Sequence, residues 1–309
     1  MGNSPKVSVC MITYGHENYI LQAIEGVLMQ KCDFEIELII ANDCSPDKTD
    51  IIIKEFIDNH PKKSCVKYFN HENNLGMMPN FIFAIKHCSG QYTALCEGDD
   101  YWTDPLKLQK QINFLETNLD YVLCFHEVNI LKPNGEITED FITKLPENYE
   151  TLETLAKLGN YIHTPSVVFR NVIHEFPFEF QCTPIGDYFL YLMLAEHGKL
   201  KILDEKMAIY RYGVGVFSST SQLQIVKNNH TLFTCLLSYL KDEQIKKIIF
   251  GRQKDDLNRI ETLIKSEYDH VFVSRNLFFK TINSLMKDYK KPKKIIKKVK
   301  AKIFRNAEK

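Results

Sequence analysis

The stretch YTALCEGDD, residues 92–100, carries the pattern from which the fold can be derived. A short apolar run leads directly into three carboxylates, Glu97, Asp99 and Asp100. Such a run is typical of a buried strand, and acids that follow it without a gap lie at the edge of the sheet. We therefore expect a site at that edge whose chemistry needs several negative charges.

The segments before this stretch alternate between strand and helix patterns. Strands are predicted at 6–13, 36–41, 66–70 and 91–96, and helices at 19–29, 49–57 and 79–87. This alternation predicts a parallel sheet with helical crossovers, in which ligands bind outside the carboxyl ends of the strands. Residues 13–14, 42–43 and 97–100 then share one rim, where converging acids can hold a divalent cation and, through it, a phosphate.

After residue 100 the chain continues with mixed strand and helix patterns, and from about residue 222 it shows only helix patterns. Further strands or extended pieces are predicted at 121–130, 166–170, 199–203 and 207–211, and helices at 105–115, 151–158 and 186–197. Asp187 stands at the start of the strongly apolar helix GDYFLYLMLAEH. From about residue 222 the pattern indicates helices only. We expect a catalytic domain over residues 1–221 and a helical extension over residues 222–309.

The composition is that of an ordinary globular protein, but the charge is unevenly distributed. The 309 residues have a formal net charge of zero, whereas residues 280–309 hold twelve Lys or Arg against two Asp or Glu. The nine cysteines include no C-x-x-C pair, which favours a reduced cytosolic protein over a disulfide frame or a zinc site. We expect neither a signal peptide nor a membrane-spanning helix.

Several elements, in this order, resemble those of family 2 glycosyltransferases, the inverting type with a GT-A fold. They are VSVCMITYGHENYI, IIANDCSPDKT, NNLGMMPN, CEGDDYWTDPLKLQKQ, GDYFLYLMLAEHGKL and MAIYR, within residues 6–220. A lone D-x-D is weak evidence, but the ordered set is specific. The resemblance implies an α/β fold with a mostly parallel Rossmann-like sheet flanked by helices. It also implies transfer of a hexose or N-acetylhexosamine from a nucleotide sugar, expected to be UDP-linked, to a glycan hydroxyl.

The resemblance also implies which residues bind the donor. Asp43 matches the acid that reads the pyrimidine edge, where a carboxylate can accept the imide N–H of uracil. Glu97 replaces the first Asp of the usual D-x-D and is expected to contact the ribose. The remaining residues expected around the nucleotide are Thr13, Tyr14, Glu17, Asn74 and Asn80.

Three residues are expected to carry the chemistry. Asp99 matches the metal ligand, with Mn²⁺ or Mg²⁺ as the cofactor. Asp187 matches the general base, which inversion by a single displacement requires. Related enzymes often have a His in the loop after MAIYR, but here that loop reads RYGVGVFSS. Arg211 is the residue that we expect near the diphosphate instead.

On the acceptor side we expect Asp100, Trp102 and His163, each with an alternative. Asp100 either faces the acceptor or orients its neighbours, Trp102 either stacks on a sugar or packs in the core, and His163 is otherwise an ordinary loop histidine. The acids have alternatives too: Asp43 as a helix cap, Asp99 and Asp100 as a solvated turn, and Asp187 as an N-cap.

The tail sequence PKKIIKKVKAKIF, residues 292–304, has its apolar residues on one helical face and lysines around the rest. A basic amphipathic helix is typical of a segment that binds an anionic membrane surface. We expect residues 290–305 to hold the protein at the cytoplasmic face of a membrane, near a lipid-linked or surface-polysaccharide acceptor. A solvated terminal helix is the alternative, and we expect no nucleic-acid partner.

Two other functional classes remain open from the sequence. A nucleotidyltransferase also binds a nucleotide and a metal on a related sheet, but ITYGHENY is not the Gly-rich, basic phosphate loop that such enzymes usually carry. The second open class is a non-catalytic protein that binds a glycan or a membrane on the same scaffold. The presence of the acids expected in an active site argues against this second class.

Overall fold

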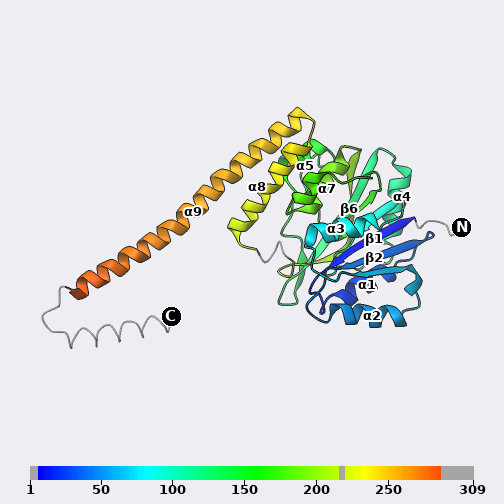
Figure 1. Cartoon of the computed structure of the whole chain (residues 1–309). Coiled ribbons are helices and arrows are strands. Elements are labelled where there is room, and N and C mark those ends of the chain that lie inside the picture. The colour runs from blue at the N-terminus through cyan, green and yellow to red at the C-terminus, as the bar shows by residue number, and fades with distance from the viewer. Residues whose placement is uncertain (1–5, 216–219, 287–309) are drawn as a thin grey trace. The chain divides into compact units, whose positions relative to one another are not determined.

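The computed structural model describes residues 6–215 and 220–286, with side chains described as far as residue 265 (Figure 1). Contacts divide the chain into a compact first unit, Met1–Asp256, and a second unit, Leu257–Lys309. The sheet, its covering helices and the candidate site all belong to the first unit. The domain boundary expected at residue 221 remains a prediction, and the basic segment 290–305 lies outside the described residues.

The first half of this unit is a parallel sheet with helical crossovers, as the sequence predicts. The strands lie in the order β3-β2-β1-β4 and all run parallel. Thr13 pairs in register with Asn42, so β1 and β2 end at the same rim. The elements are β1 (Val7–Thr13), α1 (Ile20–Leu28), β2 (Ile36–Asn42), α2 (Thr49–Asn59), the 3₁₀ turn Lys63–Cys65, β3 (Val66–Asn70), α3 (Met77–Lys86) and β4 (Tyr92–Leu95).

The second half extends this sheet with antiparallel pairings and so makes it mixed. β8 runs antiparallel to β4 and β6, β9 runs parallel to β6, and β5 pairs with β9. None of the described helices is both long and apolar enough to cross a membrane. The elements are β5 (Tyr101–Trp102), α4 (Lys107–Thr117), β6 (Tyr121–Leu131), β7 (Ile137–Glu139), α5 (Leu152–Leu158), a 3₁₀ turn (Thr164–Ser166), β8 (Val168–Arg170), α6 (Phe178–Cys182), α7 (Gly186–Ala195), β9 (Lys199–Arg211), α8 (Gln222–Tyr239) and α9 (Glu243–Met286).

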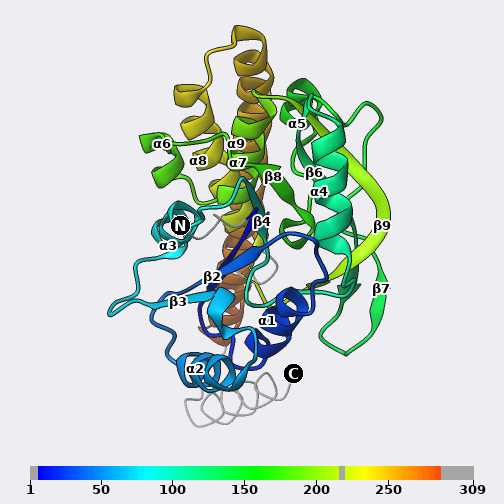
Figure 2. The ribbon, with the colours of Figure 1, turned by 90° about the vertical axis from the view of Figure 1, so that its right-hand side faces the viewer.

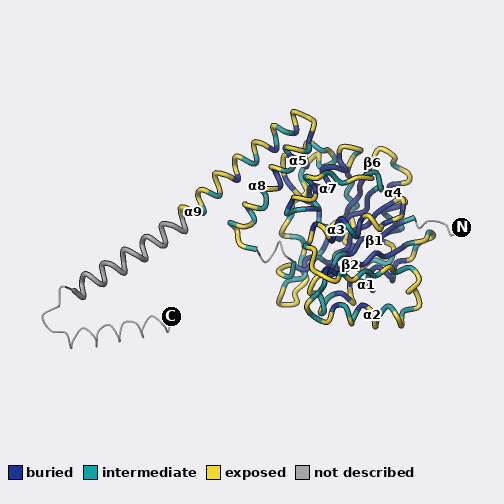
Figure 3. The backbone as a smooth tube through the Cα atoms, in the orientation of Figure 1, coloured by how far each residue is buried: buried dark blue, intermediate teal, exposed yellow. Residues whose placement is uncertain are grey.

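Each face of the sheet buries its own hydrophobic cluster. Successive residues of a strand point to opposite faces, so Val9 and Met11 of β1 join the cluster under α1, whereas Cys10 joins the cluster under α3 and α7. Figure 2 shows α1 and α2 on one side of the sheet and α3 on the other. The central strands β1, β2 and β4 are almost wholly buried and dark in Figure 3, because both of their faces are covered. This double burial explains why the strands read as continuous apolar runs.

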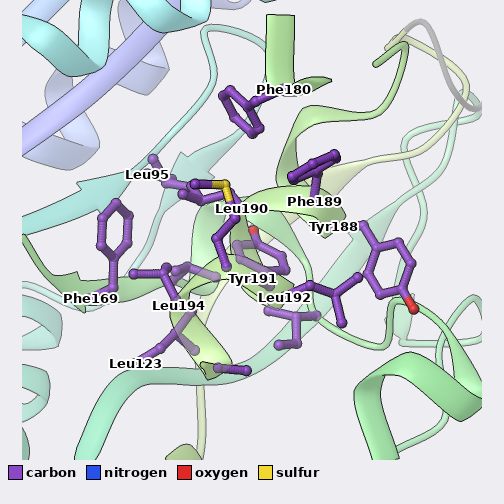
Figure 4. Packing of buried hydrophobic residues seen from close by; sticks show 14 of the residues in the cluster. Leu95, Leu123, Phe169, Phe180, Tyr188, Phe189, Leu190, Tyr191, Leu192 and Leu194 are labelled. Atoms are coloured by element: carbon purple, nitrogen blue, oxygen red, sulfur yellow. The ribbon is translucent and has the colours of Figure 1, made fainter. Parts of the chain in front are cut away.

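Helix α7 is buried along almost its whole length. Figure 4 shows its side chains, among them Tyr188, Phe189 and Tyr191, packed within one cluster. A Cβ on Gly186 would lie 2.6 Å from the sulfur of Met78, so the start of α7 packs directly against α3. The position of Asp187, the second residue of α7, is therefore fixed by the core.

The end of the sheet differs from the sequence prediction in two ways. The extended pieces at 199–203 and 207–211 form one strand, β9, because Asp204 and Glu205 fit into a bulge between the pairs Leu203–His126 and Lys206–Glu127. The two-residue strand β5 was not predicted. It brings the residues just after the acids onto β9.

Candidate active site

The three acids lie on a tight loop that leaves β4 at the carboxyl end of the parallel strands. The backbone N–H of Gly98 donates to the carbonyl of Ile12 (2.9 Å), which holds this loop against β1. Glu97, Asp99 and Asp100 each bring a carboxylate oxygen within 4.8 Å of the others. The acids expected at the rim therefore form one cluster.

Burial and crowding raise the pKa values of Glu97 and Asp100. Burial, followed by the charges of Asp99 and Asp187, raises the pKa of Glu97 to about 8. Burial and the charge of Asp99 also raise the pKa of Asp100 well above its usual range. Asp100 Oδ2 is buried and has no hydrogen-bond partner among the described residues. An added cation would relieve this repulsion, and an all-oxygen donor set suits Mg²⁺ or Mn²⁺.

Asp187 lies within electrostatic reach of the acid cluster, since its charge contributes to the raised pKa of Glu97. Its carboxylate accepts hydrogen bonds from Asn160 Nδ2 (2.9 Å) and from the backbone N–H of Tyr188 (2.7 Å). Burial raises the pKa of Asp187, although these two hydrogen bonds oppose the shift. The structure thus brings together two parts of the site that are about 90 residues apart in the sequence.

Arg211 holds the acid loop in place through its guanidinium group. Its guanidinium donates to the carbonyl of Asp99 and to Gln22 Oε1, and it lies between the rings of Tyr19 and Tyr101, at 4.9 and 4.7 Å from their centroids. The side chain is buried. Two of the five guanidinium donors thus have partners inside the fold, and the expected contact of Arg211 with the diphosphate remains a prediction.

Asp100 is tied to the backbone of a neighbouring strand. Its side chain is buried, and Oδ1 accepts the backbone N–H of Arg211 at 2.8 Å. This bond ties the acid loop to the end of β9. Of the two alternatives that the sequence left open for Asp100, the structure favours the orienting one.

The turn after β1 is clamped to the loop after β2. Gly15 N–H donates to Ser45 Oγ and Glu17 N–H to Asp47 Oδ2, each at 3.0 Å. In return, Glu17 Oε2 accepts the backbone N–H of Lys48 at 3.0 Å. Glu17 thus shapes the loop, and its expected contact with a base remains a prediction.

Two other residues expected around the base differ in their accessibility. The Tyr14 side chain is 49% exposed, so its ring is open to a ligand. Thr13 is buried, and its hydroxyl lies 3.1 Å from His16 Nδ1. Tyr14 is therefore the more accessible candidate for contact with a nucleotide.

Asp43 is buried and holds the loop after β3. Its two carboxylate oxygens accept the backbone N–H groups of Leu75 (2.7 Å) and Gly76 (2.9 Å), while Asn74 Nδ2 donates to the carbonyl of Asp43 (3.1 Å). The alternative that Asp43 caps the helix after β2 finds no support here, because its bonds go to the loop before α3. Recognition of a base by Asp43 and Asn74 remains a prediction.

Asn80 does not line an open site. Its side chain is buried, with Nδ2 donating to the carbonyl of Ala41 (3.0 Å) and Oδ1 within 2.9 Å of His71 Nε2. Both ends of the amide are used within the protein. We correct the donor-binding expectation for Asn80, which connects α3 to the end of β2.

Trp102 belongs to the core, so its placement on the acceptor side is corrected. Its side chain is 2% exposed, and Nε1 donates to the carbonyl of Pro165 at 2.8 Å. Lys107 Nζ lies 4.1 Å from the ring centroid. No open ring face remains for a sugar.

His163 is engaged by its neighbours. Its Nε2 lies 2.9 Å from Asp140 Oδ2, and its ring lies 4.9 Å from the ring of Tyr210. With its side chain largely buried, it positions these two residues and offers little surface to an acceptor. Its expected direct contact with the acceptor remains a prediction.

The sequence reasoning missed three residues of this site: His16, Asn160 and Tyr210. His16 Nε2 lies 4.0 Å from Asp99 Oδ2, so this imidazole adjoins the expected metal ligand. A signal for it existed, because His16 stands in the turn after the first strand, at the predicted rim. Tyr210 stands within MAIYR, an element of the family resemblance, which was the signal available for it. Asn160 carries no such signal, since only the folded chain brings it to Asp187.

Comparisons with known proteins agree with this geometry. The sequence model of the family described as Glycosyl transferase family 2 matches residues 8–176, which is more than half of the chain. An uncharacterized protein from Mycobacterium bovis is 35% identical over 205 residues, which cover 66% of this chain and 58% of that protein. The chain thus spans less than two thirds of the length of this relative.

Two solved structures share the fold. S. aureus TarS 1–349 in complex with UDP-GlcNAc superposes with a TM-score of 0.58 at 18% identity, covering 81% of this chain and 72% of that one. The mannosyltransferase PcManGT from Pyrobaculum calidifontis, in complex with GDP-Man and Mn²⁺, superposes with a TM-score of 0.59 at 14% identity, covering 81% and 70%. This chain belongs to glycosyl transferase family 2, and its fold is of the GT-A type, as the sequence predicts.

Proposed function

We propose that this protein is a metal-dependent inverting glycosyltransferase that moves a hexose or N-acetylhexosamine from a UDP-linked donor to a glycan hydroxyl. The observation that carries the proposal is the cluster of Glu97, Asp99 and Asp100 at the carboxyl end of the parallel strands, with Asp187 near enough for its charge to act on Glu97. Family membership supports sugar transfer. The nucleotide sugars bound to TarS and PcManGT, and the Mn²⁺ of the latter, support this donor class and a metal.

Asp99, with Glu97 and Asp100 beside it, would hold the Mn²⁺ or Mg²⁺ ion. The buried, unpaired oxygen of Asp100 and the mutual repulsion of the carboxylates fit a divalent cation. Such an ion acts as a Lewis acid that stabilises the charge on a departing diphosphate. The tyrosine of the exposed turn, Tyr14, together with Thr13, Glu17, Asp43 and Asn74, would surround the nucleotide.

Asp187 would act as the general base. One carboxylate oxygen takes the proton of the acceptor hydroxyl while the hydroxyl oxygen bonds to the anomeric carbon. The bond from that carbon to the diphosphate oxygen breaks on the opposite face, so the configuration inverts and a nucleoside diphosphate leaves. Asn160 and the backbone N–H of Tyr188 hold the carboxylate for this step. The pKa of Asp187, raised by burial, lies nearer to neutral pH, which favours general-base catalysis.

The acceptor that we propose is a surface polysaccharide, lipopolysaccharide or lipid-linked oligosaccharide, reached at the cytoplasmic face of a membrane. The support for this part is the sequence of residues 290–305, with lysines around an apolar stripe. Several lysines near an anionic surface contribute about 1 kcal/mol each.

A pair of substitutions tests the two roles assigned to the acids. Asp187→Asn should keep Mn²⁺-dependent UDP binding, measured by calorimetry, and reduce UDP release in the presence of acceptor by about 10²- to 10⁴-fold. Asp99→Asn should lose the Mn²⁺-dependent part of UDP binding. Asp33→Asn, at an exposed position, serves as the control. Undiminished turnover in the first variant would overturn the general base, and unchanged metal dependence in the second would overturn the metal ligand.

The donor is identified by a separate measurement. A ligand that binds only the folded state raises the melting temperature with its affinity. UDP- and GDP-sugars are therefore screened with Mn²⁺ present, and we expect a UDP-sugar to give the largest shift. Release of a nucleoside diphosphate also separates this activity from that of a nucleotidyltransferase, which releases pyrophosphate and which the family match does not support.

A further inference from the structure

A cavity of about 300 Å³ opens beside the end of β9. Aromatic residues form much of its lining, and Thr220, Gln222 and Ile225, at the start of α8, complete it. Its volume is at the lower end of the range of small-molecule sites. The residues that line it include Phe141, Tyr210, Tyr212, Thr220, Gln222 and Ile225.

Two of the aromatic rings are open to solvent. Phe141 is 54% exposed and Tyr212 is 37% exposed, and their rings meet edge to face with centroids 5.4 Å apart and an interplanar angle of 70°. Exposed apolar side chains that gather around a hollow mark a candidate ligand-binding groove, whereas single exposed ones are common. The pair provides a ring face that a flat apolar surface can cover.

One wall of the cavity, the turn at Phe141 together with Tyr210, is held in place before any ligand binds. Asp140 Oδ1 accepts the backbone N–H groups of Ile142 (2.7 Å) and Thr143 (3.1 Å), which fixes the turn that carries Phe141. Asp140 Oδ2 lies 2.9 Å from His163 Nε2, and the His163 ring lies 4.9 Å from that of Tyr210. A preformed wall binds with less loss of conformational freedom.

The cavity adjoins the acid cluster. Tyr210 lines it, and the next residue, Arg211, donates its backbone N–H to Asp100 Oδ1 at 2.8 Å. Burial, followed by the charges of the surrounding acids, which include Asp100 and Asp187, raises the pKa of Tyr210. A group bound against Tyr210 is therefore close to the carboxylates that would carry out the transfer.

The lining chemistry indicates the class of ligand. Among the residues that the structure describes, those that line the cavity are uncharged. Lys132 Nζ lies 5.6 Å from the centroid of the Phe141 ring, but it is paired with Glu136 Oε2 at 3.2 Å, so the lining itself offers a diphosphate no cation. Aromatic faces cover the C–H surface of a sugar ring, while hydroxyls and the Gln222 amide can pair with sugar hydroxyls. This combination suits a neutral sugar better than a phosphorylated donor or an acyl chain.

We propose that this cavity binds a neutral pyranose ring of the acceptor glycan, with the C–H face of the ring against Phe141 and Tyr212. The proposal rests on the glycosyltransferase function proposed above, for which it names the acceptor subsite. His163 and Asp140 are positioning residues in this arrangement, because they hold Tyr210 and the Phe141 turn without facing the sugar.

Saturation-transfer-difference NMR on the full chain tests the proposal directly. The probes are the methyl pyranosides of glucose, galactose, mannose and N-acetylglucosamine, with hexanol as an apolar comparison. We expect transfer to the ring C–H protons of at least one pyranoside, and at least a fivefold loss of that signal in Phe141→Ala and in Tyr212→Ala. Phe178→Ala is the matched control, since Phe178 is a 74% exposed aromatic on α6 that does not line the cavity.

Each contrary result has a distinct meaning. Transfer to none of the four pyranosides, transfer to hexanol alone, or an equal loss in Phe178→Ala would overturn the acceptor subsite. Calorimetry with Mn²⁺ and UDP on the same samples separates this failure from that of the proposed function. A wild-type protein that binds UDP but no pyranoside defeats only the subsite, whereas one that binds no nucleotide defeats the function itself. Far-UV circular dichroism confirms folding, and either aromatic variant suffices if the other does not fold.

Discussion

At the scale of single residues, Gly98 shows how closely the acid loop approaches the first strand. A Cβ at this position would lie 2.6 Å from Thr13 Oγ1 and 3.0 Å from His16 Nδ1. The φ angle of Gly98 is not among the positive ones, so the reason for glycine is space and not a left-handed backbone. The acids can approach β1 only because the residue between Glu97 and Asp99 has no side chain.

Gly98→Ala should therefore destabilise the protein. Overpacking of this kind typically costs about 1–3 kcal/mol in the free energy of unfolding, measured here by urea denaturation. The matched control is Gly251→Ala in α9, where a Cβ meets no heavy atom within 4 Å. Because alanine favours helix over glycine by about 0.5–1 kcal/mol, the control should be neutral or stabilising. Equal stability of Gly98→Ala and wild type would contradict the close approach.

At the scale of elements, the loops after β1 and β2 behave as one unit. Their mutual hydrogen bonds use both backbone and side-chain groups, including His16 N–H to Thr49 Oγ1 at 3.0 Å. A turn held in this way can present Tyr14 without becoming mobile. The rim of the sheet thus owes its shape to pairings between loops as well as between strands.

The start of α4 buries an amine. Lys107 is fully buried, donates from Nζ to Gln111 Oε1 at 2.7 Å and lies over the ring of Trp102. Burial lowers the pKa of Lys107 to about 7, against about 10.4 for an exposed lysine. Between these two values the unfolded chain holds a proton that the folded protein lacks. The free energy of unfolding must therefore rise with pH across this window.

We expect Lys107→Met to remove this pH dependence. The wild-type protein should gain stability relative to the variant between pH 7 and 8.5, by at most about 1.4 kcal/mol per pH unit. Below pH 7 the stabilities of wild type and variant should change with pH in the same way, because Lys107 is then protonated in both the folded and the unfolded wild-type chain. Urea unfolding at several pH values measures the difference. Lys86→Met, at an exposed lysine, should show no such pH-dependent difference from wild type. A stability difference between wild type and Lys107→Met that does not change with pH would disprove the lowered pKa of Lys107.

At the scale of the whole molecule, the most distinctive feature is the separation of charge along the chain. Residues 280–309 carry a net charge of +10, and the remainder carries −10. From residue 287 onward this basic part lies outside the described residues, so its role is argued from sequence alone. Its apolar stripe and lysines suit an anionic lipid surface.

Deletion of residues 290–309 tests this role. The full chain should co-sediment with vesicles that contain phosphatidylglycerol, and less so at high salt, because screening weakens the attraction. The truncated chain should remain in the supernatant and should still bind UDP and Mn²⁺. Vesicles of phosphatidylcholine alone are the control. Equal sedimentation of both chains would argue against a membrane-binding tail.

The sequence by itself determined the order of strands and helices in the parallel half, the rim at which those strands end, and the acids placed there. It could do so because apolar periodicity follows directly from burial, and parallel strands necessarily end on one side. Asp187 was also found from sequence, as the acid that begins a wholly apolar helix. Its arrival beside Glu97 was predicted from the family resemblance and not from the pattern.

Only the tertiary structure decided which side chains are free to meet a ligand. Three residues have the right chemistry for a binding site, yet their polar groups are hydrogen-bonded to partners far away in the chain. These residues are Arg211, Asn80 and Trp102. Periodicity reports whether a residue is buried but does not identify its partners. Hydrogen bonds and ring contacts between distant segments form only when the chain is folded, and they bring Asn160 to Asp187 and leave the rings of Phe141 and Tyr212 open.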